Sequence, residues 1–151
     1  MGRLKTALLA SLVLCGVAGV VSYELRAAPP SKGVNWQTDL IAAHKLSLKD
    51  HRPLLIVFSA QWCTYCRKLD QETFHDARTA EYINANFIPV HLDFDENTKI
   101  AEILEVTSLP TSVILSADAD LLGTVVKYVK KDEYKKALTA ALEFEQAIRK
   151  Q

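Results

Sequence analysis

The pattern of hydrophobic and polar positions along the chain predicts buried strands separated by helices. The strands are indicated by continuous apolar runs, and the helices by apolar residues at helical spacing. The continuous apolar run 54–58 (Leu-Leu-Ile-Val-Phe) has the length and the β-branched and aromatic content of a strand covered on both faces. A second such run spans 87–94, and shorter ones span 111–115 and 123–128, the last after a turn at 117–120. The pattern therefore predicts four strands.

Helical spacing of apolar residues fills the segments around these strands. A first helix is expected to begin at an N-cap on Asn35 or Thr38 and to stop before Pro53. Further helices are expected from about Cys63 to Phe74, over 77–84 with Asp76 as N-cap, near 100–104 and over 134–148. Helices that alternate with strands in this way indicate an α/β domain with helices on both faces of a central sheet.

The amino-terminal segment has the pattern of an export signal. Arg3 and Lys5 precede residues 6–23, which carry no charge, and the first acid is Glu24. The apolar run is long for a signal peptide and just long enough for a membrane helix, so residues 1–28 are predicted to be a signal peptide or an uncleaved membrane anchor. Bases before the run keep the amino terminus in the cytoplasm, so the domain is expected to be exported.

Composition indicates that the rest of the chain is a linker followed by one globular domain. Residues 29–34, which include two prolines and a glycine, are predicted to be a linker, and 35–151 a single domain. With 49% hydrophobic and 24% charged residues, the 151-residue chain is neither disordered nor of low complexity. Eighteen Lys plus Arg balance eighteen Asp plus Glu, which argues against nucleic-acid binding through a basic surface.

The candidate chemistry lies where the first strand is followed by a helix. Residues 62–66 read Trp-Cys-Thr-Tyr-Cys. At a helix start, Cys63 lies beside unpaired backbone N–H groups and the positive end of the helix dipole, both of which favour a thiolate. Cys66 is expected on the same helical face, deeper and within disulfide reach. The pattern predicts that Cys63 attacks a partner disulfide and Cys66 resolves the mixed disulfide.

The cysteine pair has two alternative interpretations. A zinc site normally needs four ligands, and besides this pair the domain has four histidines without ligand spacing: His44, His51, His75 and His91. We therefore expect no metal. A static disulfide is the second alternative, but closing so short a loop constrains the unfolded chain little.

The motif W-C-x-x-C at 62–66 after an apolar strand, followed by Leu109-Pro110-Thr111, resembles the thioredoxin family over roughly residues 36–148. Two segments resemble one branch of this family in particular: the strand that begins near Arg52-Pro53-Leu54, before the cysteine motif, and the E-T-F-x-D stretch at 72–76. That branch contains exported thioredoxin-like proteins and the C-terminal domain of the transmembrane thiol:disulfide interchange protein.

The resemblance implies a thioredoxin-like fold, with a central mixed sheet of four or five strands and helices on both faces. It implies that Pro110 is cis and packs against Cys63 and Cys66, the catalytic pair. Leu109 is then expected to present backbone groups to an extended substrate, and Trp62 to flank the reactive sulfur, with core packing as the alternative for Trp62. Substrate-binding residues are therefore predicted to be Trp62, Leu109 and Pro110.

Four positions depart from the family pattern. Val57 stands where thioredoxins carry a buried Asp, so the usual proton acceptor for the resolving thiol is missing. His91 occupies a strand position that often holds a Lys; it is interpreted either as a partial substitute or as an ordinary satisfied histidine. Between the two cysteines, Thr64-Tyr65 replaces the Gly-Pro of thioredoxins. Because these two positions strongly influence the reduction potential, the resemblance does not determine the direction of electron flow.

The predicted function is exported thiol:disulfide exchange with protein cysteines, with a lean towards reductase and no bound cofactor. We expect a monomer in the periplasm, or anchored by residues 6–23 to the inner membrane and facing the periplasm, recharged by a membrane electron donor. Protein thiols and disulfides are the expected partners, and nucleic acid is not. The alternatives are a metal- or copper-handling thioredoxin-like binding module and a disulfide-donating oxidase or isomerase.

Overall fold

A computed structural model of the chain describes residues 33–150, so the predicted signal or anchor at 1–28 and most of the linker lie outside the described residues. The sheet has four strands in the order β2-β1-β3-β4. They are β1 (Leu54–Ser59), β2 (Ile88–Asp93), β3 (Thr111–Leu115) and β4 (Leu121–Val126). β1 pairs parallel to β2 and antiparallel to β3, and β3 pairs antiparallel to β4, which makes the sheet mixed as predicted.

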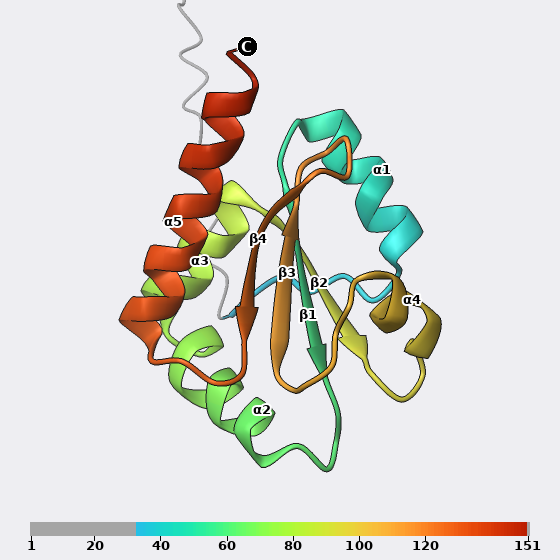
Figure 1. Cartoon of the computed structure of the whole chain (residues 1–151). Coiled ribbons are helices and arrows are strands. Elements are labelled where there is room, and N and C mark those ends of the chain that lie inside the picture. The colour runs from blue at the N-terminus through green and yellow to red at the C-terminus, as the bar shows by residue number, and fades with distance from the viewer. Residues whose placement is uncertain (1–32, 151) are drawn as a thin grey trace, which may run out of the picture.

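Helices cover both faces of this sheet (Figure 1). They are α1 (Leu40–Asp50), α2 (Thr64–Leu69), the π-helical turn η1 (Asp70–Phe74), α3 (Ala77–Asn86), α4 (Thr98–Ile103) and α5 (Lys131–Ile148). α1 and α4 lie on one side of the sheet, and α3 and α5 lie on the other. Among the described residues, none of these helices combines the length and the apolar character that a membrane crossing requires.

The central strand β1 explains why the domain has two apolar cores. Successive side chains of a strand point to opposite faces, so Leu55 and Val57 pack with α3, α5 and η1, whereas Ile56 and Phe58 pack with α1 and α4. All four are essentially inaccessible to solvent. Burying a side chain such as Phe58 contributes roughly 1.5–3 kcal/mol, so the continuous apolar run is the natural sequence for a strand with two covered faces.

Several predicted element boundaries were wrong, among them the starts of α1, β4 and α5, which begins at Lys131 rather than at 134. The N-cap of α1 is Asp39, whose Oδ1 accepts the N–H groups of Ile41 and Ala42 at 2.8 and 3.0 Å. Neither Asn35 nor Thr38 caps the helix, because the preceding segment is extended and Gln37 bridges to Val90 at the edge of β2. β4 begins at Leu121, two residues earlier than predicted, because the antiparallel register pairs Leu121 with Leu115.

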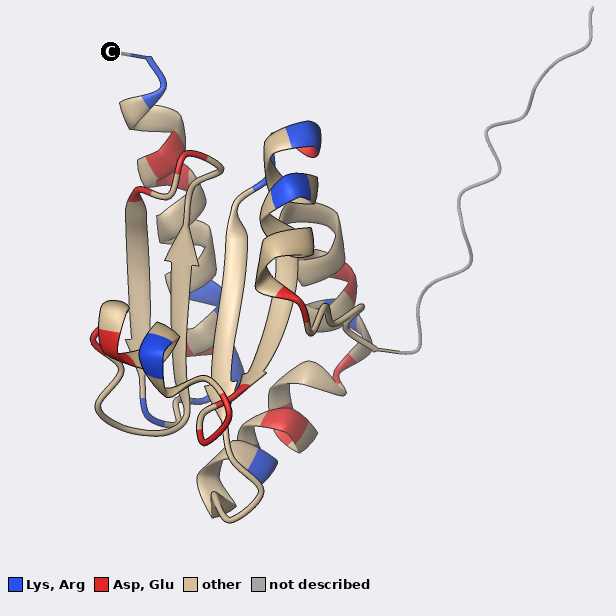
Figure 2. Ribbon diagram, turned by 90° about the vertical axis from the view of Figure 1, so that its right-hand side faces the viewer, with Lys and Arg blue, Asp and Glu red and all other residues tan. Residues whose placement is uncertain are grey.

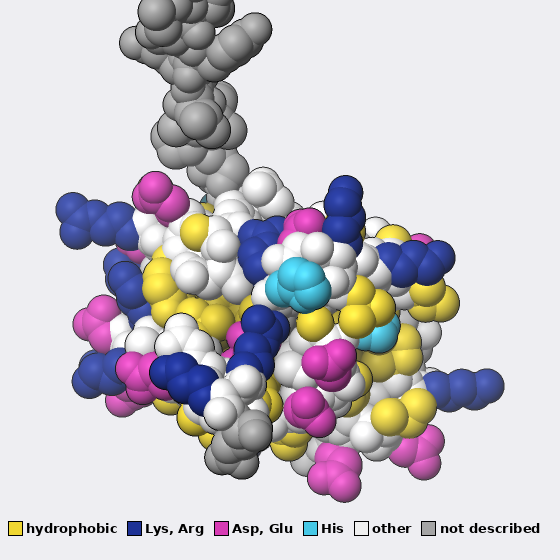
Figure 3. All heavy atoms as spheres, turned by 90° about the horizontal axis from the view of Figure 1, so that it is seen from above, with side chains coloured by type: hydrophobic (Ala, Val, Ile, Leu, Met, Phe, Trp, Pro, Cys, Tyr) yellow, Lys and Arg dark blue, Asp and Glu magenta, His cyan; other side chains and the backbone are white. Residues whose placement is uncertain are grey.

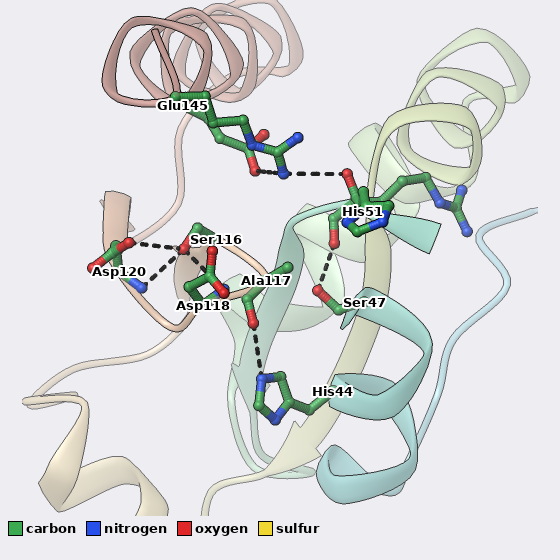
Figure 4. A network of polar contacts seen from close by, with 10 residues as sticks. His44, Ser47, His51, Ser116, Ala117, Asp118, Asp120 and Glu145 are labelled. Carbon is green, nitrogen blue, oxygen red and sulfur yellow. Dashed lines mark hydrogen bonds and ion pairs between the residues drawn. The ribbon is translucent and has the colours of Figure 1, made fainter. Parts of the chain in front are cut away.

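A polar network closes the end of the sheet that lies away from α2 (Figure 4). The Ser116 hydroxyl accepts the backbone N–H groups of Asp118 and Asp120, which holds the turn between β3 and β4. Arg149 joins the Glu145 carboxylate at 2.7 Å to the carbonyl of His51. Seen from this end, charges of both signs are interspersed with small apolar patches (Figure 3).

Candidate active site

A disulfide joins Cys63 and Cys66 at the junction of β1 and α2, with Cα atoms 5.3 Å apart. Cys63 is the N-cap of α2, and its Sγ accepts the backbone N–H of Cys66 at 3.1 Å. Such a hydrogen bond from an otherwise unpaired N–H group favours negative charge on that sulfur once the disulfide is reduced. Both residues are buried, at 6% and 7% exposure, so exposure does not distinguish them, and the prediction that Cys66 lies deeper than Cys63 stays a prediction.

Backbone and side-chain contacts hold the loop between β1 and the disulfide. The strand ends at Ser59, and the buried Ala60 accepts the Cys63 N–H at 3.1 Å, which turns the chain into the helix. Arg67, one turn into α2, donates to the Gln61 carbonyl at 2.7 Å and to the Thr64 hydroxyl at 3.2 Å. The Arg67 guanidinium on α2 therefore holds the loop that precedes the helix.

The segment before β3 lies at the same end of the sheet and packs against the disulfide (Figure 1). The Leu109–Pro110 peptide bond is cis, as the sequence resemblance implied. Leu109 contacts the cluster formed by Ala60, Cys63 and Cys66, and Pro110 lines the same small cavity as Cys66. The Pro110 carbonyl accepts the Lys127 N–H at 2.8 Å, which ties this segment to the chain after β4.

Trp62 points away from the buried part of the site. Its side chain is 64% exposed, and its indole N–H donates to the Asp95 carboxylate at 2.8 Å. Asp95 belongs to the acidic turn after β2, which lies beside the loop into α2 (Figure 2). Asp95 was not identified from the sequence, because 33 positions separate it from Trp62. The predicted role of Trp62 beside the reactive sulfur stays a prediction.

A second aromatic group lies on the α2 side of the disulfide. Tyr65 is 61% exposed, and its ring centroid lies 6.3 Å from that of Tyr128. The Tyr128 hydroxyl donates to the Glu72 carboxylate, a bond that raises the pKa of Tyr128. The Lys68 ammonium lies 4.5 Å from the centre of the same ring. Trp62 and Tyr65 thus form an exposed aromatic rim around a buried disulfide.

Polar groups also reach the inner side of the disulfide. Asp70 and His91 line the cavity that contains Cys66, and Val57 forms part of its apolar wall. The sequence pointed to Val57 and His91 but missed Asp70. A signal was present, because Asp70 follows Cys66 by four residues and so shares its helix face. Within residues 33–150, no group of three or more His, Cys, Asp or Glu side chains is arranged to hold a metal ion.

The fold and the disulfide at a strand-to-helix junction define a thiol:disulfide oxidoreductase. The family model described as "Thioredoxin-like domain" matches residues 41–142. The chain belongs to this family of thioredoxin-like proteins.

Similar proteins agree with this assignment. The chain is 31% identical over 123 residues to "Thioredoxin H2" of Arabidopsis thaliana. The aligned region covers 81% of this chain and 84% of that protein. It is 31% identical over 67 residues to the "Thiol:disulfide interchange protein DsbD" of Ralstonia nicotianae, over 41% of this chain and 11% of that protein. The solved structure titled "DsbH Oxidoreductase" has a TM-score of 0.66 at 20% identity, over 80% of this chain and 93% of that one, and therefore shows the shared fold.

Proposed function

We propose that this protein is an exported reductase of protein disulfides that works through Cys63 and Cys66 without a bound cofactor. The carrying observation is the Cys63–Cys66 disulfide itself, which lies at the start of α2 with the Cys66 N–H directed at Cys63. A thiol pair in this position is suited to exchange, because the first sulfur is held as an acceptor of hydrogen bonds and the second is within bonding distance.

The reaction proceeds in two exchanges. In the reduced protein the Cys63 thiolate attacks one sulfur of a partner disulfide, and the other partner sulfur leaves as a thiolate. Cys66, after losing its proton, attacks Cys63 Sγ, and the second partner sulfur leaves. The partner disulfide is reduced to two thiols, and the Cys63–Cys66 pair is oxidised to a disulfide.

Exposed surface around the site favours a protein as the partner. Trp62 and Tyr65 present large apolar rings to solvent, and such rings contribute strongly to protein interfaces. The backbone beside Leu109 is adjacent to the disulfide and is suited to pair with an extended partner segment, which would add affinity without reading sequence. Protein thiols and disulfides are therefore the proposed partners, and a membrane protein is the proposed electron donor.

Export is proposed from the pattern of the first 28 residues. The uncharged segment 6–23 follows two bases, which is the pattern of a signal peptide or an anchor. The name of one relative, a thiol:disulfide interchange protein, supports a place in electron transfer between thiols. A membrane-impermeant maleimide tests this in intact cells that carry a Cys15→Ser, Cys66→Ser variant, whose only thiol is Cys63, after treatment of the cells with dithiothreitol. Protection of the Cys63 thiol until the cells are lysed would refute export.

Substitution of each cysteine tests the mechanism. We expect Cys63→Ser to reduce disulfide exchange to the uncatalysed rate, because the attacking sulfur is gone. We expect Cys66→Ser to accumulate partners as mixed disulfides with Cys63, because the resolving sulfur is gone. Non-reducing gels of partner proteins distinguish the two variants. Full exchange activity in Cys63→Ser protein would contradict the proposal.

The direction of electron flow is tested by the reduction potential of the Cys63–Cys66 couple. Titration of the full chain with dithiothreitol or glutathione gives this value. A potential near that of thioredoxin, about −270 mV, supports a reductase, whereas one near about −120 mV identifies an oxidant that donates disulfides. Absence of a reversible disulfide would instead favour the binding module, and metal analysis of the reduced protein would then be the next measurement.

A further inference from the structure

A small cavity lies against the buried side of Cys66. Its volume is about 120 Å³, which is enough for several water molecules. It lies between β1, α2, η1, β2 and the cis-proline segment, and its lining combines apolar and ionisable residues. The lining residues are Val57, Cys66, Arg67, Leu69, Asp70, Phe74, His91 and Pro110.

The proposed exchange requires a proton acceptor at this place, so the following inference rests on the proposed function. Cys66 must lose its thiol proton before it attacks Cys63 Sγ, because the thiolate is the nucleophile. Cys66 is 7% exposed, and a bound partner covers the outer side of the disulfide further. The route for the proton therefore leads inward, towards the cavity.

His91 is held in a fixed orientation on the wall of this cavity. It pairs with Val57 in the register of β1 and β2, and its Nε2 shares a hydrogen bond of 2.7 Å with the Ser59 hydroxyl. The Trp36 ring lies against the imidazole, with centroids 5.2 Å apart. A side chain held on two sides in this way keeps its place while a proton is transferred.

The charges around His91 suit a proton acceptor. Burial lowers the pKa of His91, and the carboxylates of Asp70 and Asp93 partly oppose this effect. The imidazole is therefore neutral at neutral pH and able to accept a proton, and the two carboxylates stabilise the imidazolium that results. Arg67, the cation in the cavity lining, is engaged by Gln61 and Thr64 through its guanidinium.

An imidazole also matches the thiol better than the neighbouring carboxylate does. Proton transfer is most efficient between groups of similar pKa, and ordinary values are about 8.5 for a thiol, about 6.5 for an imidazole and about 3.9 for an aspartate. The Asp70 side chain is 46% exposed, and its carboxylate lies 3.5 Å from His75 Nδ1, so it faces solvent as well as the cavity.

We propose that His91 accepts the thiol proton of Cys66 through water in this cavity during resolution of the mixed disulfide. The Cys66 S–H bond breaks and its proton moves to the imidazole. Cys66 Sγ then forms the disulfide with Cys63 Sγ, and the partner sulfur leaves with the electron pair of the broken S–S bond. The imidazolium returns the proton to solvent once the partner has left.

The two exchanges are separable with the aromatic disulfide dithiobis(nitrobenzoate), which releases one coloured thiolate in each step. Full-length protein that carries Cys15→Ser has Cys63 and Cys66 as its only thiols. Stopped-flow mixing with this protein in the reduced state gives a concentration-dependent first phase from Cys63 and a concentration-independent second phase from Cys66. We compare wild type, His91→Gln and His44→Gln in this background between about pH 5 and 9. His44 is a matched control: it is half-buried and bound to the Ala117 carbonyl at 3.0 Å, on the face covered by α1 and α4.

We expect His91→Gln to leave the first phase unchanged and to slow the second about 100-fold near neutral pH. The deficit should shrink as pH rises, because at high pH the thiol ionises without an acceptor. His44→Gln should match wild type. A second phase that is unchanged in His91→Gln, or slowed equally at every pH as a purely structural effect predicts, overturns the inference.

Asp70→Asn provides an independent test that keeps the imidazole in place and serves if His91→Gln fails to fold. Asp70 raises the pKa of His91, so its neutralisation lowers that pKa. The decrease in the rate of the second phase at acid pH should then occur at a lower pH than in wild type. An unmoved acid limb overturns the role of His91 while the proposed function stands. Wild-type protein that releases no thiolate at all would overturn both.

Discussion

At the scale of single residues, Asp76 shows how one carboxylate joins elements that are distant in sequence. It caps α3 by accepting the Thr79 N–H at 3.0 Å, as predicted from its place before the helix, and it also accepts the Thr79 hydroxyl at 2.8 Å. Its second oxygen pairs with the Lys131 ammonium at 2.8 Å, at the start of α5. The bond to Lys131, followed by those to Thr79, lowers the pKa of Asp76 from 3.8 to about 2.

This shift predicts a specific acid dependence of stability. The folded-state pKa lies below the unfolded value, so the Asp76 carboxylate stabilises the fold above about pH 3.8, and this contribution is lost as pH falls towards about 2. The melting temperature of wild type should therefore decline as the pH falls between these values, in part because Asp76 becomes protonated. We expect Asp76→Asn, which keeps a capping side chain, to lack this contribution and so to show a smaller decline. Glu81→Gln, an exposed change on the same helix, is the control. An equal acid decline in Asp76→Asn and wild type would contradict the assignment.

At the scale of elements, α1 shows why helix boundaries were harder to predict than helix existence. Its apolar spacing was correct, but three cap-forming residues stand near its start: Asn35, Thr38 and Asp39. The choice depends on where the chain leaves the edge of β2, because the bridge between Gln37 and Val90 keeps the preceding segment extended. The cap therefore follows from a contact between residues far apart in sequence.

Asp39→Ala is expected to destabilise the fold by about 1 kcal/mol, because two backbone N–H groups of α1 lose their acceptor. Thr38→Ala, one position earlier, should change stability by less than about 0.5 kcal/mol. Urea unfolding with an unchanged m-value measures both differences. An effect of Thr38→Ala equal to that of Asp39→Ala would show that the cap is misassigned.

At the scale of the whole molecule, the sheet divides the domain into two apolar cores and places the disulfide at one end of both. Leu109 packs with the core under α1 and α4, and it also contacts the disulfide cluster. On the other face, Leu69 and Phe74 belong to the core under α5 and also line the cavity beside Cys66. Both cores therefore support the position of the disulfide, so the site depends on the whole domain.

Truncation in the α5 core tests this arrangement. Leu138 is completely buried in that core, so Leu138→Ala should cost about 2–5 kcal/mol through lost burial and the cavity left behind. Phe144→Ala on the same helix, where the ring is 50% exposed, should cost about 0.5 kcal/mol or less. Chemical denaturation measures both. Comparable losses in the two variants would mean that α5 does not pack against the sheet through Leu138.

The sequence by itself determined the features that depend on neighbours in the chain. The apolar run of β1 specifies a strand with two covered faces, and Cys63 and Cys66 follow it at a spacing that one helical turn brings within disulfide reach. Only the tertiary structure decided what surrounds them. Asp95 meets Trp62, and His91 and Pro110 line the cavity of Cys66, because strand order and register bring distant segments together. Local patterns specify elements, whereas the pairing of strands specifies which side chains share a site.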